Sequence, residues 1–267
     1  MTRIHPTALI AKGAELDADV EIGPYSIIGP GVRIAAGSVI GAHVVIDGDT
    51  TLGRDNRIFP FASIGGAPQD KKYRDEPTRL VIGDRNTIRE SVTINRGTMQ
   101  DQGLTRVGDD NWIMAYVHIA HDCVVGNNTI FANSTNLGGH VEIGDWVILG
   151  GASGVHQFCK IGAHAMTAVG TVVLHDVPPF TMVSGNTAQA HGINAEGLKR
   201  RGFSAGRIQA IRRAHRLLYR EGLTLEQARE ALAAVERQAS LDPQGEADSD
   251  LRMLAGFLQR VTRGIVR

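Results

Sequence analysis

The sequence predicts an all-β solenoid, a parallel β-helix of hexapeptide repeats over residues 1–186, followed by an α-helical segment over residues 187–267. Every sixth residue from Ile4 to Ile64 is isoleucine or leucine, glycine often follows that residue, and the six-residue period gives way to a helical period after Pro179. A period of six fits a short strand followed by a turn, and fits neither a helix nor a long strand. Three such hexads make one coil of about 18 residues, and the coils stack at the roughly 4.8 Å spacing of paired strands.

The aliphatic column continues through most of the predicted β-helix. It resumes at Ile82, slips by one residue, and runs again from Val107 to Val173 with one polar member, Thr167. We expect these side chains to fill the interior of a prism.

Residues 66–80 and 97–106 interrupt the repeat. Insertions in a solenoid form loops on one face, which is often the binding face. For the polar segment 97–106, a tolerated surface insertion is an equally good interpretation.

The C-terminal segment carries helix signals in order. Ser204 is a predicted N-cap for a helix that Gly222 ends, Thr224 opens a second helix, and Asp250 begins a third. Open β-helix ends need capping, so we expect these helices to form a small cap that also contributes trimer or partner contacts.

The charge distribution excludes some classes of function. The chain has 28 basic and 28 acidic residues, which argues against a protein that binds nucleic acid over its whole surface. Residues 191–267 hold 14 of the basic and 9 of the acidic residues. This basic surface suits phosphate groups or an acidic protein partner, although a solvated helix face is the usual alternative.

Targeting and redox signals point to the cytoplasm. Neither a signal-peptide core nor an apolar run long enough for a membrane span is present. Cys123 and Cys159 are too few for a disulfide framework or a zinc knuckle. Both stand at the fifth hexad position, where small residues pack inside a coil, so we expect them to be buried structural side chains.

Histidines are the candidate catalytic residues. His118, His121, His140 and His156 fall within three coils, and His121 and His140 are about one coil apart, so these two side chains could face one ligand. Asp122 follows His121 and could orient it as a general base. The backbone N–H of Gly139 could approach an oxyanion, although a tight coil corner explains this glycine equally well.

A metal is the alternative use of these histidines, because a β-helix trimer can bind zinc between subunits. The spacing matches no catalytic zinc motif, and acyl transfer by a histidine base needs no metal, so we predict neither metal nor cofactor. A zinc-dependent hydratase or a non-catalytic scaffold remains the rival interpretation.

Five stretches carry a resemblance that covers the whole chain: QDKKY at 69–73, IRESVTI at 88–94, HIAHD at 118–122, VHQFC at 155–159 and NAEGLKRRGF at 194–203. With them the chain resembles the UDP-N-acetylglucosamine acyltransferases of lipid A biosynthesis, a family of left-handed hexapeptide-repeat β-helices. The resemblance implies transfer of an (R)-3-hydroxyacyl chain from acyl carrier protein to the sugar 3-hydroxyl, the first step of lipid A biosynthesis. It also implies a homotrimer with sites shared between neighbouring subunits.

The same resemblance assigns residue roles. It implies that His121 is the base, that Asp122 supports it, and that the Gly139 backbone serves the oxyanion. The residues it implies for substrate binding are Asp70, Lys72, His118, His140, His156, Gln157, Asn194, Glu196, Arg200 and Arg201.

Two positions bear on how closely the chain follows the family. Asn95 stands where the family commonly has a histidine. Met166 and Val169 fall at the acyl-length ruler, and Val169 stands where a glycine can occur in members that take longer chains. A side chain there should shorten the groove, because an added methylene that does not fit costs about 1–3 kcal/mol. We therefore expect a preference for chains shorter than 14 carbons.

Overall fold

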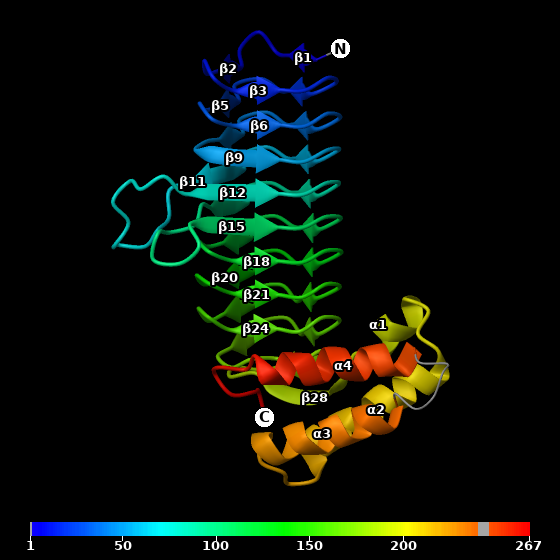
Figure 1. Ribbon diagram of the computed structural model, residues 1–267. Coiled ribbons are helices and arrows are strands. Elements are labelled where there is room, and N and C mark those ends of the chain that lie inside the picture. Colours follow the sequence, from blue (N-terminus) through cyan, green and yellow to red (C-terminus); the bar gives the residue numbers. More distant parts are fainter. Residues whose placement is uncertain (1, 240–245) are drawn as a thin grey trace.

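The computed structural model describes residues 2–239 and 246–267, and it confirms the predicted β-helix and helical segment (Figure 1). Three sheets of 11, 9 and 8 short strands form the walls of a prism, and we call them sheets A, B and C; their strands are parallel except for the last strand of sheet A. Each coil contributes one strand to each sheet, so Ile4 pairs with Ile22 and Ile10 with Ile28.

Sheet A contains, in spatial order, β1 (Arg3–Ile4), β4 (Glu21–Ile22), β7 (Val39–Ile40), β10 (Arg57–Ile58), β13 (Thr87–Ile88), β16 (Trp112–Ile113), β19 (Ile130–Phe131), β22 (Ile148–Leu149), β25 (Met166–Thr167), β27 (Thr181–Ser184) and β28 (Gln189–Ile193). Sheet B contains β2 (Leu9–Ile10), β5 (Ile27–Ile28), β8 (Val45–Ile46), β11 (Ser63–Gly66), β14 (Thr93–Asn95), β17 (His118–Ile119), β20 (Asn136–Leu137), β23 (Gly154–Val155) and β26 (Val172–Val173). Sheet C contains β3 (Glu15–Leu16), β6 (Arg33–Ile34), β9 (Asp49–Leu52), β12 (Arg79–Ile82), β15 (Leu104–Val107), β18 (Val124–Val125), β21 (Glu142–Ile143) and β24 (Lys160–Ile161).

The aliphatic column fills the prism, as predicted. From Ile22 onward its members are buried, whereas Ile4 in the first coil is 45% exposed because no coil precedes it. Cys123 and Cys159 are fully buried and free, as expected. The polar Thr167 is also buried, and its hydroxyl accepts a hydrogen bond from the Gly150 N–H at 2.8 Å.

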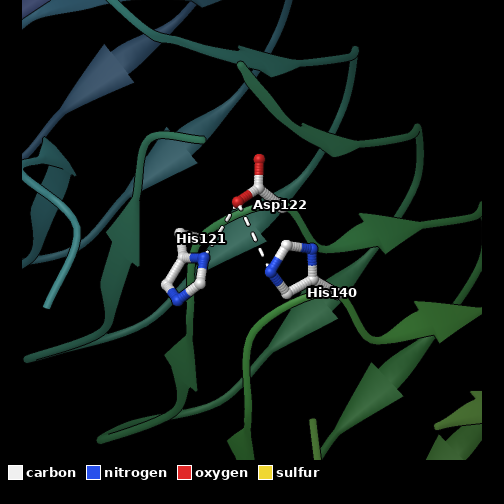
Figure 2. Close-up of side chains that lie close together, drawn as sticks. All are labelled: His121, Asp122 and His140. Atoms are coloured by element: carbon white, nitrogen blue, oxygen red, sulfur yellow. Dashed lines mark hydrogen bonds and ion pairs between the residues drawn. The ribbon is translucent and has the colours of Figure 1, made fainter. Parts of the chain in front are cut away.

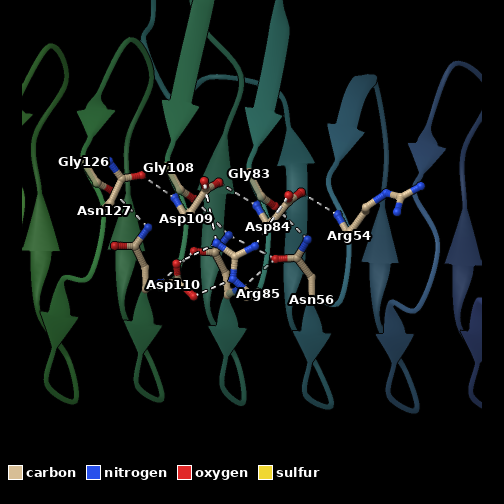
Figure 3. Close-up of polar contacts among 12 residues, drawn as sticks. Arg54, Asn56, Gly83, Asp84, Arg85, Gly108, Asp109, Asp110, Gly126 and Asn127 are labelled. Carbon is tan, nitrogen blue, oxygen red and sulfur yellow. Dashed lines mark hydrogen bonds and ion pairs between the residues drawn. The ribbon is translucent and has the colours of Figure 1, made fainter.

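Ladders of asparagine and aspartate bind successive coils along the edge between sheets C and A (Figure 3). On the outer ladder, Asp84 N–H donates to Asp109 Oδ1 at 2.8 Å, and Asp109 N–H donates to Asn127 Oδ1 at 2.7 Å. On the buried ladder, Asn111 N–H donates to Asn86 Oδ1 at 2.9 Å. These side chains satisfy turn N–H groups that lie outside the strand pairs, which stabilises the corner.

Both insertions leave the prism at one edge, between sheets B and C. The first loop, residues 67–78, joins β11 to β12, and the second loop, residues 96–103, joins β14 to β15 (Figure 1). Each insertion ends earlier than the sequence indicated, because its last residues belong to four-residue strands that begin at Arg79 and Leu104. Both insertions lie on the same face of the β-helix, which is the arrangement expected if this face binds a ligand.

The C-terminal segment forms four helices beyond an antiparallel β27–β28 hairpin: α1 (Ala195–Arg200), α2 (Ala205–Arg220), α3 (Leu225–Ala239) and α4 (Glu246–Gln259). Ser204 caps α2, and Thr224 caps α3 through reciprocal bonds with Gln227, both as predicted.

One prediction about the helices was wrong, and one helix was not predicted. α4 begins four residues before Asp250, and the sequence analysis did not identify α1. Asp250 acts instead as a partner of Arg207, which donates two hydrogen bonds to its carboxylate.

Candidate active site

The candidate site lies at the B–C edge, on the turns that follow β17, β20 and β23. The turn residues of successive coils stack in columns. Asp122 and His140 occupy one column, where both adopt the left-handed conformation with φ of 58° and 60°. His121 and Gly139 occupy the neighbouring column. The sequence prediction that His121 and His140 face the same place therefore agrees with the geometry, and their rings meet edge to face with centroids 5.1 Å apart.

A hydrogen-bond chain fixes the His121–Asp122 pair (Figure 2). His121 Nδ1 lies 2.9 Å from Asp122 Oδ2. The Asp122 side chain is almost completely buried, and the second loop holds it, because Thr98 donates from its N–H at 2.9 Å and from its hydroxyl at 2.6 Å. An ionised carboxylate is an acceptor only, so His121 carries its proton on Nδ1 and presents the Nε2 lone pair.

The electrostatics of this pair follow from those contacts. Burial alone would raise the pKa of Asp122, but the hydrogen bonds from His121 and Thr98 outweigh it and hold the pKa below its usual value. His118 behaves differently. Burial, followed by the nearby charge of His121, lowers the pKa of His118, and its Nδ1 meets the Thr93 hydroxyl at 2.7 Å.

His140 has a separate set of neighbours. Its Nδ1 lies 2.8 Å from Asp101 Oδ2, which the second loop brings to it, and its ring stacks on Phe158 with centroids 4.4 Å apart. Its Nε2 points toward Asp122 Oδ2 at 3.9 Å, which is too long for a hydrogen bond (Figure 2).

Gly139 lies directly beside the ring of His121. A Cβ atom at this position would stand 2.5 Å from His121 Cε1, so any side chain would displace the imidazole. Among the described residues, no backbone carbonyl accepts a hydrogen bond from the Gly139 N–H. The position of Gly139 therefore agrees both with an N–H that binds an oxyanion and with a glycine required by a tight coil corner.

His121, Asp122 and His140 are also the candidates for metal binding, because one ligand atom from each lies within 4.8 Å of the others. Zinc–nitrogen bonds of about 2.0–2.1 Å place tetrahedral ligands roughly 3.3 Å apart, so His140 would have to move to complete such a site. Asp122 Oδ2 is also engaged by two hydrogen bonds. The residues as they stand form a hydrogen-bonded arrangement rather than a coordination shell.

The remaining predicted residues at the B–C edge form hydrogen bonds with groups other than His121, Asp122 and His140. Asp70 and Lys72 lie in the first loop, where Asp70 Oδ1 accepts from the Lys72 N–H at 2.9 Å. His156 and Gln157 are exposed on the turn after β23, and His156 Nδ1 donates to the Gln157 carbonyl. Asn95 binds the Ala67 carbonyl through its amide nitrogen, while its buried Oδ1 has no hydrogen-bond partner among the described residues.

The predicted acyl-ruler residues lie at a different edge. Met166 is on β25 in sheet A, and Val169 follows it on the turn toward sheet B, where it is 79% exposed in the single chain. Val169 is therefore an open surface side chain in the monomer.

The predicted nucleotide-binding residues lie at the C–A edge, on and around α1. Asn194 is buried, caps α1 and donates to the His164 carbonyl at 3.1 Å. Arg201 donates to the Trp146 carbonyl at 3.0 Å and meets His164 Nδ1 at 3.2 Å. Burial, followed by the charge of Arg201, lowers the pKa of His164 to about 4, so its neutral ring accepts this bond.

Glu196 and Arg200 remain exposed on the same helix, with Glu196 paired to Lys199. Within one chain, His121, His140 and both loops thus lie at the B–C edge, whereas α1 lies at the C–A edge. His121 lies between strands of sheets B and C, whereas Trp146, which anchors Arg201, lies between strands of sheets C and A.

Sequence reasoning missed three residues of the site. Thr98 and Asp101 come from the segment 97–106, for which a surface insertion and a binding loop were equally open, and their contacts favour the binding loop. Phe158 follows Gln157 in the sequence, lies in the same column as Asp122 and His140, and stacks on His140. Its spacing of one coil from His140 was the signal that could have identified it.

No helix in the described part of the chain is long and apolar enough to cross a membrane.

Comparison with known proteins gives concordant matches along the chain. The family described as "Udp N-acetylglucosamine O-acyltransferase; Domain 2" matches residues 176–266, and "Bacterial transferase hexapeptide (six repeats)" matches residues 1–36, 13–48 and 104–139. Proteins named acyl-[acyl-carrier-protein]--UDP-N-acetylglucosamine O-acyltransferase from Thiobacillus denitrificans and Verminephrobacter eiseniae are 59% and 60% identical over the full length of both chains.

Solved structures agree with this. The UDP-N-acetylglucosamine O-acyltransferase of Moraxella catarrhalis is 44% identical with a TM-score of 0.94, and the match covers 99% of each chain. The enzyme of Francisella novicida also has a TM-score of 0.94, at 39% identity, and the match covers 99% of this chain and 94% of that one.

Proposed function

Because the chain belongs to the UDP-N-acetylglucosamine O-acyltransferase family, we propose that it transfers an (R)-3-hydroxyacyl chain from acyl carrier protein to the 3-hydroxyl of UDP-N-acetylglucosamine, the first step of lipid A biosynthesis. The observation that carries this proposal is the His121–Asp122 pair, in which His121 Nδ1 lies 2.9 Å from a buried carboxylate. Such a pair leaves Nε2 as a base of fixed orientation.

The proposed mechanism is direct transfer in a ternary complex. His121 Nε2 accepts the proton of the sugar hydroxyl while the hydroxyl oxygen attacks the thioester carbonyl. The Gly139 N–H faces the oxyanion that develops on that carbonyl. As the C–S bond breaks, the imidazolium returns its proton to the departing thiolate. Cys123 and Cys159 take no part, because burial raises the pKa of Cys123 to about 12 and of Cys159 to about 11.

The test is replacement of His121 by alanine. UDP-N-acetylglucosamine is incubated with acyl carrier proteins that carry either 3-hydroxyacyl or unhydroxylated acyl chains, and the sugar nucleotide is then analysed by mass spectrometry. Loss of a general base costs about 100-fold or more, so H121A should lose at least that much turnover. His175, an exposed histidine outside the site, gives the matched control variant H175A. Near-normal turnover in H121A would contradict the proposed base, and absence of O-acylated product from the unaltered protein would contradict the proposed reaction.

The proposed assembly is a homotrimer whose sites lie between subunits. Its support is the separation, within one chain, of the catalytic histidines at the B–C edge from Arg200 at the C–A edge. In a closed ring, His121 of one subunit and Arg200 of its neighbour complete one site. We also propose that residues 1–186 form the acyltransferase domain and residues 187–267 a helical domain, since the helices have an apolar cluster of their own.

Mixed trimers of H121A and R200A chains test this arrangement. Any trimer that contains both chain types has one interface in three with an intact His121 facing an intact Arg200, so about one third of its sites should be active. If one chain supplied both residues, every site would carry one of the two substitutions and activity would stay at the level of the parent variants. Two affinity tags separate the mixed trimers, and light scattering checks their mass.

A further inference from the structure

The second loop reaches the candidate active site with two side chains, Thr98 and Asp101, and only Thr98 contacts the carboxylate that supports His121. Thr98 is fully buried and binds Asp122. Asp101, three residues later, is partly exposed, and its Oδ2 lies 2.8 Å from His140 Nδ1. The site therefore contains a second histidine–carboxylate pair beside His121–Asp122, and its carboxylate comes from a loop rather than from the coil.

This second pair fixes the tautomer of His140. A carboxylate is only an acceptor, so the proton of a neutral imidazole lies on Nδ1 and the lone pair lies on Nε2. Nε2 lies 3.9 Å from Asp122 Oδ2, beyond hydrogen-bond distance, and forms no hydrogen bond with any described residue, so its lone pair is not used within the chain.

The orientation of the ring is fixed as well. Phe158 stacks on one face of His140 at an interplanar angle of 10°, which sets the plane of the imidazole. Stacking does not distinguish a ring from its flipped form, in which Nδ1 and Cδ2 exchange places. The hydrogen bond to Asp101 makes that distinction, because only Nδ1 can donate to the carboxylate.

We propose that Asp101 is a positioning residue for sugar recognition: it holds His140 with Nε2 as an acceptor for a hydroxyl group of the sugar nucleotide. This inference rests on the proposed function. Asp101 acts through His140 and does not contact the base, so its effect falls on substrate binding in the ground state and the transition state alike.

The expected kinetic signature follows from that. Loss of an interaction made equally in both states raises KM and leaves kcat unchanged. The hydrogen bond is charge-assisted but partly exposed, so D101A should raise the KM for UDP-N-acetylglucosamine about 3- to 10-fold. D101N should be no better than D101A, because its amide can donate to Nδ1 and favour the opposite tautomer. Gln102, exposed on the same loop, gives the control variant Q102A, for which KM should stay within about 2-fold.

A double-mutant cycle separates positioning from a general effect of the loop. The Kd for UDP-N-acetylglucosamine is measured by calorimetry for the full-length protein, D101A, H140A and D101A/H140A. If Asp101 acts through His140, D101A should weaken binding about 3- to 10-fold in the unaltered protein and less than about 2-fold in the H140A background.

Three results would overturn the proposal: a D101A variant with unchanged KM and Kd, a loss of equal size in both backgrounds, or a D101N variant that binds normally while D101A does not. These outcomes are distinguishable from failure of the proposed function, because that failure would appear as absence of O-acylated product from the unaltered protein.

Discussion

Replacement of Gly139 by alanine should inactivate the enzyme without unfolding it. Gly139 has no positive φ, so its backbone conformation is open to alanine, and the substitution keeps the N–H proposed to face the oxyanion. What changes is the space beside His121. The added Cβ would lie 2.5 Å from Cε1 and 2.7 Å from Nε2 of that ring.

The size of the effect follows from those distances. The imidazole would have to move by about 0.9 Å for the 2.5 Å approach to return to the 3.4 Å of an ordinary contact. A misplacement of about 1 Å of a catalytic group costs on the order of 100-fold in rate. Because His121 is tied to Asp122 through Nδ1, the movement also strains or breaks that hydrogen bond. We therefore expect kcat of G139A to fall about 100-fold.

The assay compares kcat and the thermal midpoint of G139A with those of a matched glycine variant. Gly154, on β23 one coil further along, has no atom within 4 Å of the position where its Cβ would stand, so G154A should keep normal turnover. A G139A enzyme with kcat within about 3-fold of the unaltered protein would refute the idea that this glycine exists to make room for the base.

Three further changes test other parts of the structure. Thr98→Val removes a hydrogen bond that lowers the pKa of Asp122, so that pKa should rise. On acidification the variant should then lose activity at a higher pH than the unaltered protein does, and its kcat should drop about 10-fold. An unchanged pH–rate profile would contradict this. Val169→Gly should shift the preferred acyl chain to a greater length in the product mass spectrum, and an unchanged preference would remove Val169 from the ruler. Asn111→Ala removes hydrogen bonds to the N–H and hydroxyl of Thr129 within the buried ladder, so the free energy of unfolding in urea should fall by about 3 kcal/mol, and a change below about 1 kcal/mol would mean that the ladder contributes little.

The periodic part of this protein could be predicted because one residue in six decides it. Where the column is aliphatic, as at Ile22 or Ile64, the only way to bury it at that spacing is a stack of short strands. The helix caps at Ser204 and Thr224 were predictable for a similar reason, since they depend on local hydrogen bonds. The start of α4 was not, because the partner of Asp250 is an arginine far away in the sequence.

The candidate site divides in the same way. His121 and His140 could be paired from sequence, because their separation is close to one coil and stacking then brings them together. Thr98 and Asp101 could not, because a loop without periodicity has no register that predicts where its side chains lie. Arg201 illustrates a third case, in which a charged residue suited to phosphate is also engaged by a carbonyl and a buried histidine of its own chain.

The asparagine and aspartate ladders give the β-helix unequal strength along its length. Their rungs join the coils from Arg54 to Asp145, which are the coils that also carry both loops and His121. A solenoid pulled along its axis bears the load in series, so it separates first at the coils with the weakest joints. The first coils at the N-terminal end, which precede the ladder and bury less of their apolar column, should therefore peel away while the catalytic corner is still intact. Local unfolding of the N-terminal coils would therefore leave the coils that carry His121 folded.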